Sequence, residues 1–286
     1  TTGNYNVALG YASLEANTTG ANNTSIGFRS LDANTTASNN TAVGYNSLTA
    51  NTTGTANVAV GHTSLDANTT GNYNVAVGGE TLSDVTTGSF NTGVGDGAGA
   101  NITTASDNSA FGGGSLLTNT TGASNTAIGK NALRANTTAS NNTAVGTSAL
   151  ADNTTGDENN AIGGGALGNN TTGVDNDAQG YHALFDNTTG SSNVAMGNRA
   201  LATNTTASNN TAIGYVALAA NTTGIRNVAL GSNALDANTV GDKNIAIGMD
   251  ALGANVDGSR SVAVGDSALM VQDPASAVAM YNTAVG

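Results

Sequence analysis

The chain has 286 residues, of which only 9% are charged, and its formal net charge is -12. It contains no cysteine, which excludes disulfides, thiolate metal sites and a cysteine nucleophile, and its seven lysines and arginines are too few for a nucleic-acid surface. No run approaches the roughly 18 consecutive apolar residues of a membrane helix, so direct membrane insertion is not expected.

The sequence repeats one unit of 17 residues. Sixteen glycines, from Gly10 to Gly265, are spaced by 17, and only the last step, to Gly286, is longer, at 21 residues. A fixed period filled with Gly, Asn and Thr argues against a helix and indicates a solenoid in which each unit forms one coil. We expect an all-β fold, a parallel β-solenoid of about sixteen coils over residues 1–269, with an irregular insertion or cap and a final partial repeat at 270–286.

The expected strands are the short apolar segments that end at each glycine, such as 7–9 and 24–26. We expect the residue before the glycine (Leu9, Ile26, Val43 and onward) and a later leucine to form two aliphatic core rows. The alanine two residues before the glycine faces the opposite side of the strand, so either the coil is thin or another chain lies against it. Because each unit has few large apolar side chains, we expect a partner chain to complete the burial.

Each unit places the same residue types at the same distances from its glycine, which predicts continuous ladders along the solenoid. Asn stands four residues before the glycine and Leu four after it, each with one exception, and a second Asn stands seven after it in thirteen of sixteen units. Amide side chains stacked in register can hydrogen-bond from coil to coil. The ladders begin with Gly10, Gly27, Gly44 and Gly61; Asn6, Asn23, Asn40 and Asn57; Leu14, Leu31, Leu48 and Leu65; and Asn17, Asn34 and Asn51.

Aromatic rings follow the glycine in the first four units, at Tyr11, Phe28, Tyr45 and His62. Rings in register can stack and stabilise a solenoid. If they face solvent, the same rings form a flat strip that could face a ligand such as a sugar.

Threonine pairs follow the second asparagine in nearly every unit. Regular Thr rows are a feature of ice-binding solenoids, but neighbouring residues on a strand point to opposite faces, so one column per coil would be presented. The Asn-Thr-Thr triplets also match the acceptor pattern for N-glycosylation. Systematic glycosylation is not expected if the asparagines point inward.

The titratable residues give no pattern typical of catalysis, so we expect no enzyme. His62 and His182 have no cysteine or repeated carboxylate to orient them. We expect no cofactor, and calcium is the only metal considered. Glu158 lies one period from Asp175, with Asp177 nearby, and such a group is either a solvated acidic corner or a site for a hard cation.

Three places depart from the repeat. The stretch 78–117 lacks one leucine and two asparagines and could be a bend, a docking point or a less stable patch. Gln179 replaces an aliphatic residue and indicates a locally imperfect core. Pro274 lies in the only insertion and cannot donate to a ladder, which predicts an interruption or cap.

Residues 40–48 (NTAVGYNSL) and 51–54 (NTTG) resemble the repeats of phage and prophage tail-fibre proteins and the head repeats of YadA-like trimeric autotransporter adhesins. The resemblance covers essentially the whole chain. It implies a left-handed parallel β-roll, usually trimeric, that serves as a spacer and adhesive head on a cell or virion surface.

We therefore expect a non-enzymatic extracellular structural protein, a stiff fibre or head segment for surface attachment. The expected partners are further copies of the chain, as a trimer or an end-to-end filament, and cell-surface or matrix glycans. The alternative is an ice-binding or glycan-binding solenoid module.

Overall fold

The computed structural model describes residues 2–273 and 278–286, a part of the chain that excludes Pro274. Over these residues the chain forms seventeen strands of three residues each, with no helix, and the strands pair in parallel. The predicted all-β parallel solenoid with 17-residue coils is therefore confirmed. The strands are β1 (Val7–Leu9), β2 (Thr24–Ile26), β3 (Thr41–Val43), β4 (Val58–Val60), β5 (Val75–Val77), β6 (Thr92–Val94), β7 (Ser109–Phe111), β8 (Thr126–Ile128), β9 (Thr143–Val145), β10 (Asn160–Ile162), β11 (Asp177–Gln179), β12 (Val194–Met196), β13 (Thr211–Ile213), β14 (Val228–Leu230), β15 (Ile245–Ile247), β16 (Val262–Val264) and β17 (Thr283–Val285).

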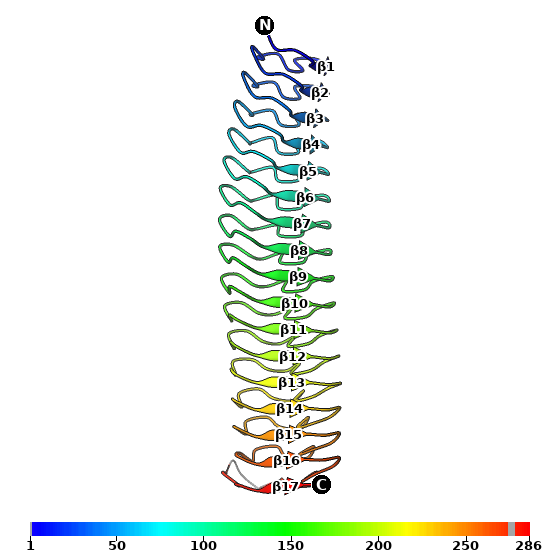
Figure 1. Ribbon diagram of the computed structural model, residues 1–286, viewed down its shortest axis with the longest axis vertical. Helices are drawn as coiled ribbons and strands as arrows, with labels where there is room; N and C mark the ends of the chain where they lie inside the picture. Colours follow the sequence, from blue (N-terminus) through cyan, green and yellow to red (C-terminus); the bar gives the residue numbers. More distant parts are fainter. Residues whose placement is uncertain (1, 274–277) are drawn as a thin grey trace. The chain divides into compact units, whose positions relative to one another are not determined.

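The structure comprises two compact units, residues 1–141 and 142–286, which are built alike. Strands β1–β8 belong to the first unit and β9–β17 to the second. Within each unit the strands are stacked in chain order, one strand per coil (Figure 1). An unbroken 17-residue period gives no sign of this division.

Like residues pair with like because neighbouring strands are one period apart. In the first unit Ala42 of β3 pairs with Ala59 of β4. The 21-residue step before β17 keeps the same register, since Ala263 pairs with Ala284. β17 therefore continues the alanine column of the preceding strands.

Each strand ends at a glycine with a backbone conformation that other residues rarely adopt. The φ angles of Gly44 and Gly61 are 142° and 137°. A Cβ atom on Gly44 would overlap the carbonyl group of Gly61, and one on Gly61 would overlap that of Gly78. The glycines are thus vertical neighbours, and their lack of a side chain lets successive coils approach.

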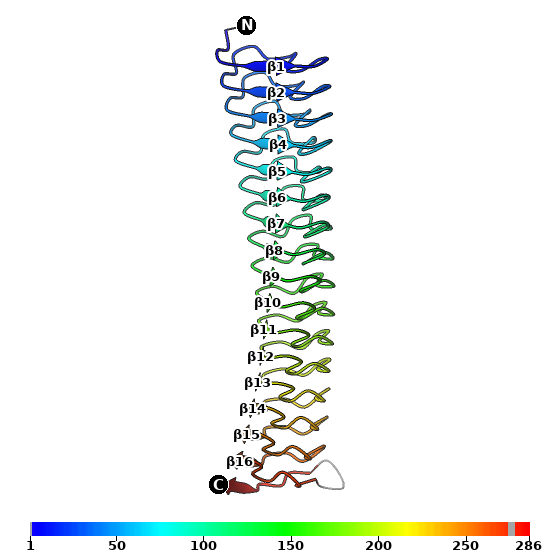
Figure 2. The same cartoon turned by 90° about the vertical axis from the view of Figure 1, so that its right-hand side faces the viewer.

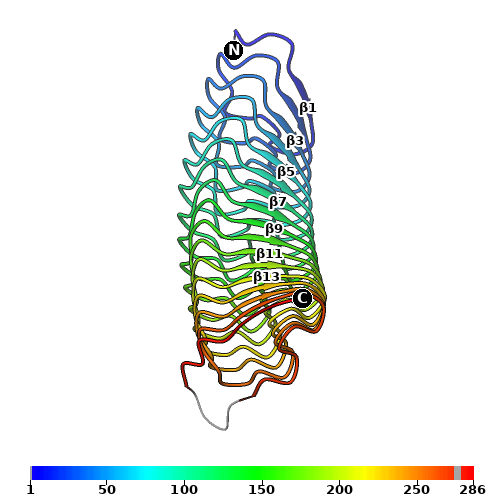
Figure 3. The same cartoon turned by 60° about the horizontal axis from the view of Figure 1, so that its bottom comes forward.

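The interior of each coil is thin. Within each unit the strands form one side of the coil and turn segments close the rest of it (Figures 2 and 3). The middle residue of each strand from β2 to β16 is buried, and in most coils so is the leucine that follows the glycine. Ala42 and Leu48 are both fully buried. Of the two explanations for the alanine column, the thin coil is the one observed.

The aliphatic residue before each glycine faces outward, which corrects the expected core. Leu9, Ile26 and Val43 belong to this row, and successive strand residues point to opposite faces, so an inward alanine turns both of its neighbours outward. Gln179 lies in this outward row, so it marks no imperfection of the core.

The leucines also turn the chain. Leu31, Leu48 and Leu65 have φ angles of 50°, 52° and 53°, a left-handed conformation that is uncommon outside glycine. The backbone N–H of Leu48 donates to the carbonyl of Ser64 at 3.0 Å, which ties this corner to the next coil. Burial of the leucine side chain, worth roughly 1.5–3 kcal/mol, offsets a backbone strain of about 1–3 kcal/mol.

Two columns of asparagines hydrogen-bond the coils together at another corner. Oδ1 of Asn40 accepts from the backbone N–H of Asn57 at 2.9 Å, and its Nδ2 donates to the carbonyl of Gly54 at 2.9 Å. Asn51 donates to the same carbonyl at 2.9 Å and to Oδ1 of Asn34 at 3.2 Å. These asparagines are fully buried, so their side-chain amides satisfy backbone groups that water cannot reach.

In the irregular stretch of the first unit, the loss of one core leucine is compensated by two aliphatic residues that replace asparagines. Gly99 stands in the leucine column, while Val85 and Ile102 stand in the second asparagine column and are fully buried. A Cβ atom on Gly99 would lie 2.8 Å from Cδ2 of Leu82 and 3.0 Å from Cδ1 of Ile102, so these side chains fill the space. One consequence is that Oδ1 of Asn68 is buried without a partner, because the next coil offers Val85 in place of an amide.

Candidate functional site

The outward residues of the strands form an apolar surface in each unit. We call the first and third residues of β1–β8, and separately those of β9–β17, the strand face of each unit. Val, Ile, Leu and Thr dominate both faces, and Asp177 is the only charged residue among these strand positions. Ile128 in the first unit and Leu230 in the second are each 42% exposed. Contiguous apolar surfaces of this kind are typical of interaction sites.

Three of the four predicted aromatic residues stack. The ring centroids of Tyr11 and Phe28 are 5.3 Å apart and those of Phe28 and Tyr45 are 5.4 Å apart, with nearly parallel planes. Such stacking buries ring faces against one another and leaves mainly edges toward solvent, so these rings stabilise the coils better than they would hold a sugar ring. His62 instead approaches Glu80, with Nε2 to Oε1 at 3.9 Å.

Another aromatic cluster lies in the second unit. His182 is sandwiched between Tyr181 and Phe185, with ring centroids 3.9 and 4.4 Å away. The preceding coil accommodates these rings because glycines stand beside them: a Cβ atom on Gly165 would meet His182, and one on Gly168 would meet Phe185. The extra glycines at 165 and 168 are the sequence signal that could have indicated this cluster.

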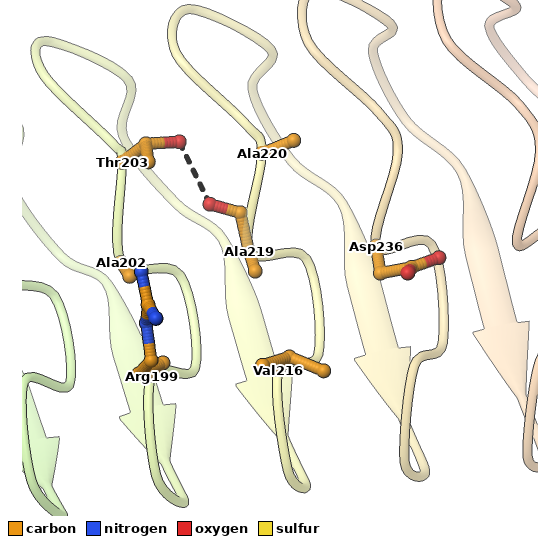
Figure 4. A pocket seen from close by; sticks show the side chains of 7 residues that line it. All are labelled: Arg199, Ala202, Thr203, Val216, Ala219, Ala220 and Asp236. Atoms are coloured by element: carbon orange, nitrogen blue, oxygen red, sulfur yellow. Dashed lines mark hydrogen bonds between the residues drawn. The ribbon is translucent and has the colours of Figure 1, made fainter.

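A surface pocket of about 350 Å³ lies on the second unit, outside the strands (Figure 4). Three successive coils line it with Arg199, Ala202 and Thr203, then Val216, Ala219 and Ala220, then Asp236. Ala202 and Ala219 occupy the same position in two successive coils, and the following coil carries Asp236 at that position. Thr203 Oγ1 donates to the carbonyl of Ala219 at 2.7 Å, which fixes the floor.

The two charged residues of the pocket stand at its opposite ends. Arg199 is exposed, and within the described part of the chain neither Arg199 nor Asp236 forms an ion pair. Burial raises the pKa of the half-buried Asp236 above its ordinary value, and the negative charge of Asp250 adds to that effect. This pocket could not be predicted from the sequence, because Arg199 is one of several scattered basic residues.

Asp66 occupies the same column in the first unit. Burial raises its pKa above the ordinary 3.8, and the carboxylates of Asp84 and Glu80 act in the same direction. The folded chain therefore holds the proton more tightly than the unfolded chain does, and the free energy of unfolding falls as pH rises through the window above 3.8.

We expect Asp66→Asn to raise the melting temperature slightly at pH 7, because it removes a half-buried charge, and to have no such effect well below pH 3.8, where Asp66 is protonated in both states. Thermal unfolding followed by circular dichroism at several pH values checks this. Asp96→Asn, at an exposed position, is the control. A gain that persists at low pH would contradict the assignment to ionisation.

Glu158, Asp175 and Asp177 do not form a cation site. Glu158 and Asp175 are exposed at a turn, whereas Asp177 lies on the strand face. Oδ1 of Asp177 accepts from the side-chain amides of Asn160 at 3.0 Å and Gln179 at 3.2 Å. No group of three carboxylates or histidines suited to a metal occurs among the described residues.

In each threonine pair the first residue bonds to the next coil and the second faces solvent. The carbonyl of Thr69 accepts from the backbone N–H groups of Thr52 and Thr53 at 3.0 and 3.2 Å, and from Oγ1 of Thr52 at 3.1 Å. Thr53 is exposed, so each coil presents a single free column of threonines. Asn51, the acceptor of the matching Asn-Thr-Thr triplet, is fully buried and cannot receive a glycan in the folded chain.

No protein-family model, curated protein or solved structure matches this chain. Within residues 2–273 and 278–286, no helix has the length and apolar character needed to cross a membrane. Function is therefore inferred from the chain's own surfaces.

Proposed function

We propose that the chain is a structural segment of an extracellular fibre or adhesin on a cell or virion surface, and that copies of it associate through their strand faces. The observation that carries this proposal is the strand face of each unit. It is apolar, regular and partly exposed, and its only charge is Asp177 in the second unit.

A second copy of the chain is the partner that fits this surface best. Identical chains carry identical rows at identical spacing, so side chains of two copies can interdigitate, as they do between sheets packed about 10 Å apart. The near absence of charge matters because the chain carries a net charge of -12, and most other surfaces of two copies would repel. Each unit offers sixteen or eighteen outward strand residues, close to the roughly 20–30 per side of a stable interface.

The ladders supply the mechanical part of the function. Within each unit, neighbouring coils are joined by strand pairing, and most of them also by buried asparagines and by the threonine corner. Because the same bonds recur in each coil, a segment within a unit resists local opening and protease access. The resemblance to tail-fibre and adhesin-head repeats supports a trimer and a location on a cell or virion surface.

Sedimentation velocity of the full chain tests the association. We expect wild-type protein to sediment as a multiple of 27.8 kDa, and the triple variant Val77→Glu, Ile128→Glu and Leu230→Glu to sediment as a monomer, because like charges would face each other across the interface. Asp177 and Gln179 already stand on this face, so polar side chains there are compatible with the fold.

The matched control places the same charges on the exposed threonine column, as Thr36→Glu, Thr104→Glu and Thr223→Glu. This variant should associate like the wild type, and circular dichroism should show that both variants retain β-structure. A wild type that sediments only at monomer mass, or a control that dissociates as fully as the face variant, would contradict self-association through the strand face.

Ice binding receives less support from the threonine corner. The hydroxyl of the first threonine of a pair donates to a backbone carbonyl, as that of Thr52 does. Only the column of second threonines is left to contact ice. An ice-binding surface requires regular rows on a flat face, and this corner is a turn.

A further inference from the structure

We propose that exposed asparagines at the bend before the strands, among them Asn22, Asn39 and Asn209, are acceptors for N-linked glycosylation. The residue two positions before each strand is called the bend residue. Each of these asparagines begins an Asn-Asn-Thr triplet, which matches the acceptor pattern Asn-x-Ser/Thr. The triplets are distinct from the Asn-Thr-Thr triplets of the second asparagine column. The proposal does not depend on self-association, because a single chain contains each acceptor.

The bend residue and the first strand residue vary together in the way that an acceptor requires. Asparagine is the bend residue before four of the seventeen strands in the described residues, and all four strands begin with threonine. Of the other thirteen described strands, three begin with threonine. The shape of the bend does not require asparagine, since Tyr73 and Arg226 adopt the same left-handed conformation, with φ angles of 56° and 60°. Backbone conformation therefore does not explain the pairing of Asn with Thr, whereas an acceptor site does.

The backbone of the bend is fixed, while the asparagine side chain is left free. The backbone N–H of Asn39 donates to the carbonyl of Ala21 at 3.0 Å, and that of Asn209 donates to the carbonyl of Ser191 at 3.1 Å. Both asparagines are exposed, and their side-chain amides form no hydrogen bond within the described residues. The same position holds large side chains in other coils, such as Tyr73, which is 55% exposed, so a sugar has space there.

The threonine hydroxyls of these triplets are also free. Thr41 and Thr211 are the first residues of β3 and β13, and both are partly exposed on the outward side of the strand. Neither hydroxyl forms a hydrogen bond in the part of the chain that the structure describes. Because the acceptor pattern admits only serine or threonine at this position, the hydroxyl is the group that a transferase recognises.

The other Asn-x-Ser/Thr triplets of the chain lack one of these features. The asparagines of the two buried columns, such as Asn51, do not reach solvent. Asn101 is exposed, but Thr103 of its triplet donates its hydroxyl to a backbone carbonyl of the next coil at 3.1 Å. Asn169 donates its side-chain amide to Oδ1 of Asp186 at 3.0 Å. The bend asparagines therefore differ in accessibility from the rest of this Asn-rich and Thr-rich chain.

The proposed modification is a substitution at the anomeric carbon of a nucleotide-diphosphate sugar. The side-chain Nδ2 of the asparagine forms a bond to that carbon, and the bond between the carbon and the diphosphate oxygen breaks. The nucleotide diphosphate leaves with the bonding electron pair, and the amide nitrogen gives up one proton to a base of the transferase. A glycan attached in this way is bulky and hydrophilic, so it requires an exposed acceptor.

Incubation of the folded full chain with a soluble asparagine glucosyltransferase and UDP-glucose tests the proposal. Intact mass and peptide mapping are the readouts, and an Asn-Ala-Thr peptide is the positive control of the enzyme. We expect glucose on Asn209 and Asn141, which is exposed and begins the same triplet, and on at least one of Asn22 and Asn39, which lie one coil apart. Asn101 and Asn169 should be modified at least tenfold more slowly, and Asn51 should remain unmodified.

Variants of one triplet separate the acceptor from the general surface. Thr211→Val should abolish the glucose at Asn209 and leave the other sites unchanged. This variant should fold, because Val194 and Val228 stand beside Thr211 in the neighbouring strands. Thr211→Ser keeps the hydroxyl and should retain the modification.

The converse variant builds an acceptor in a coil that has none. Ala56→Asn together with Val58→Thr completes a triplet with Asn57 and should add one glucose at position 56. Three results would overturn the proposal: a folded chain that stays unmodified along the bend while the peptide is modified, equal modification of Asn51 and Asn209, or wild-type modification of Asn209 in Thr211→Val.

Discussion

Gly61→Ala is expected to destabilise the first unit by about 3 kcal/mol or more. The new Cβ would overlap the carbonyl of Gly78 in the next coil, and the φ angle of 137° strains any residue with a side chain. The neighbour is backbone and is held in a ladder on both sides, so no flexible group can move away. The coils can accommodate the methyl group only by separating.

Thermal unfolding and amide hydrogen exchange check this prediction. We expect exchange to increase in the coils around residues 44–78 more than in distant coils of the same unit, because each coil contacts mainly its neighbours. Gly113→Ala is the matched control: its nearest heavy atom would lie at 3.9 Å and its φ is not positive, so it should be neutral or slightly stabilising. Equal effects of the two variants would contradict a steric role for the glycine column.

The architecture could be predicted from the sequence because a fixed repeat length determines which residues lie above one another. A period of 17 without insertions forces like residues to stack, and the register of Ala42 with Ala59 follows directly. The second asparagine column bonds amide to amide for the same reason, as Asn51 does to Asn34, whereas Asn40 of the first column bonds to backbone groups of the next coil, which the sequence did not predict.

The inward and outward assignment of the strand residues was wrong because hydrophobicity alone was used to choose the core. Val43 is more apolar than Ala42, yet alanine is inside. The thin coil has space opposite the leucine for a methyl group only, and Leu48 reaches the core from a left-handed backbone that leucine seldom adopts. Single-residue preferences therefore favour the opposite arrangement, and only the closed geometry of the coil reverses it.

The pocket could not be predicted because it depends on which residues are small. Ala202 and Ala219 look unremarkable in an alanine-rich chain, yet their small side chains leave the space that forms the pocket. Columns that hold the coils together are uniform, whereas the columns that vary from coil to coil face solvent. This separation lets a repeat carry a local surface pocket without a change in its ladders.

Asn210→Ala is expected to destabilise the second unit by about 2–3 kcal/mol. Oδ1 of Asn210 accepts from the backbone N–H of Asn227 at 2.9 Å, and its Nδ2 donates to the carbonyl of Gly224 at 2.9 Å. The substitution leaves that buried N–H without an acceptor, which costs about 1–3 kcal/mol, and creates a small cavity. Gly224 keeps one donor, Asn221, so the loss is concentrated at the N–H of Asn227.

Chemical unfolding measures this effect, with Asn198→Ala at an exposed position of the same unit as the control, for which a change within ~0.5 kcal/mol is expected. Asn210→Asp adds a test of the mechanism, because a carboxylate keeps the acceptor for Asn227 but loses the donor and buries a charge. Burial raises the pKa of such a carboxyl, so this variant should be less stable at pH 7 than at pH 4 relative to the wild type. If Asn210→Ala and Asn198→Ala unfold alike, the asparagine column does not hold the coils together.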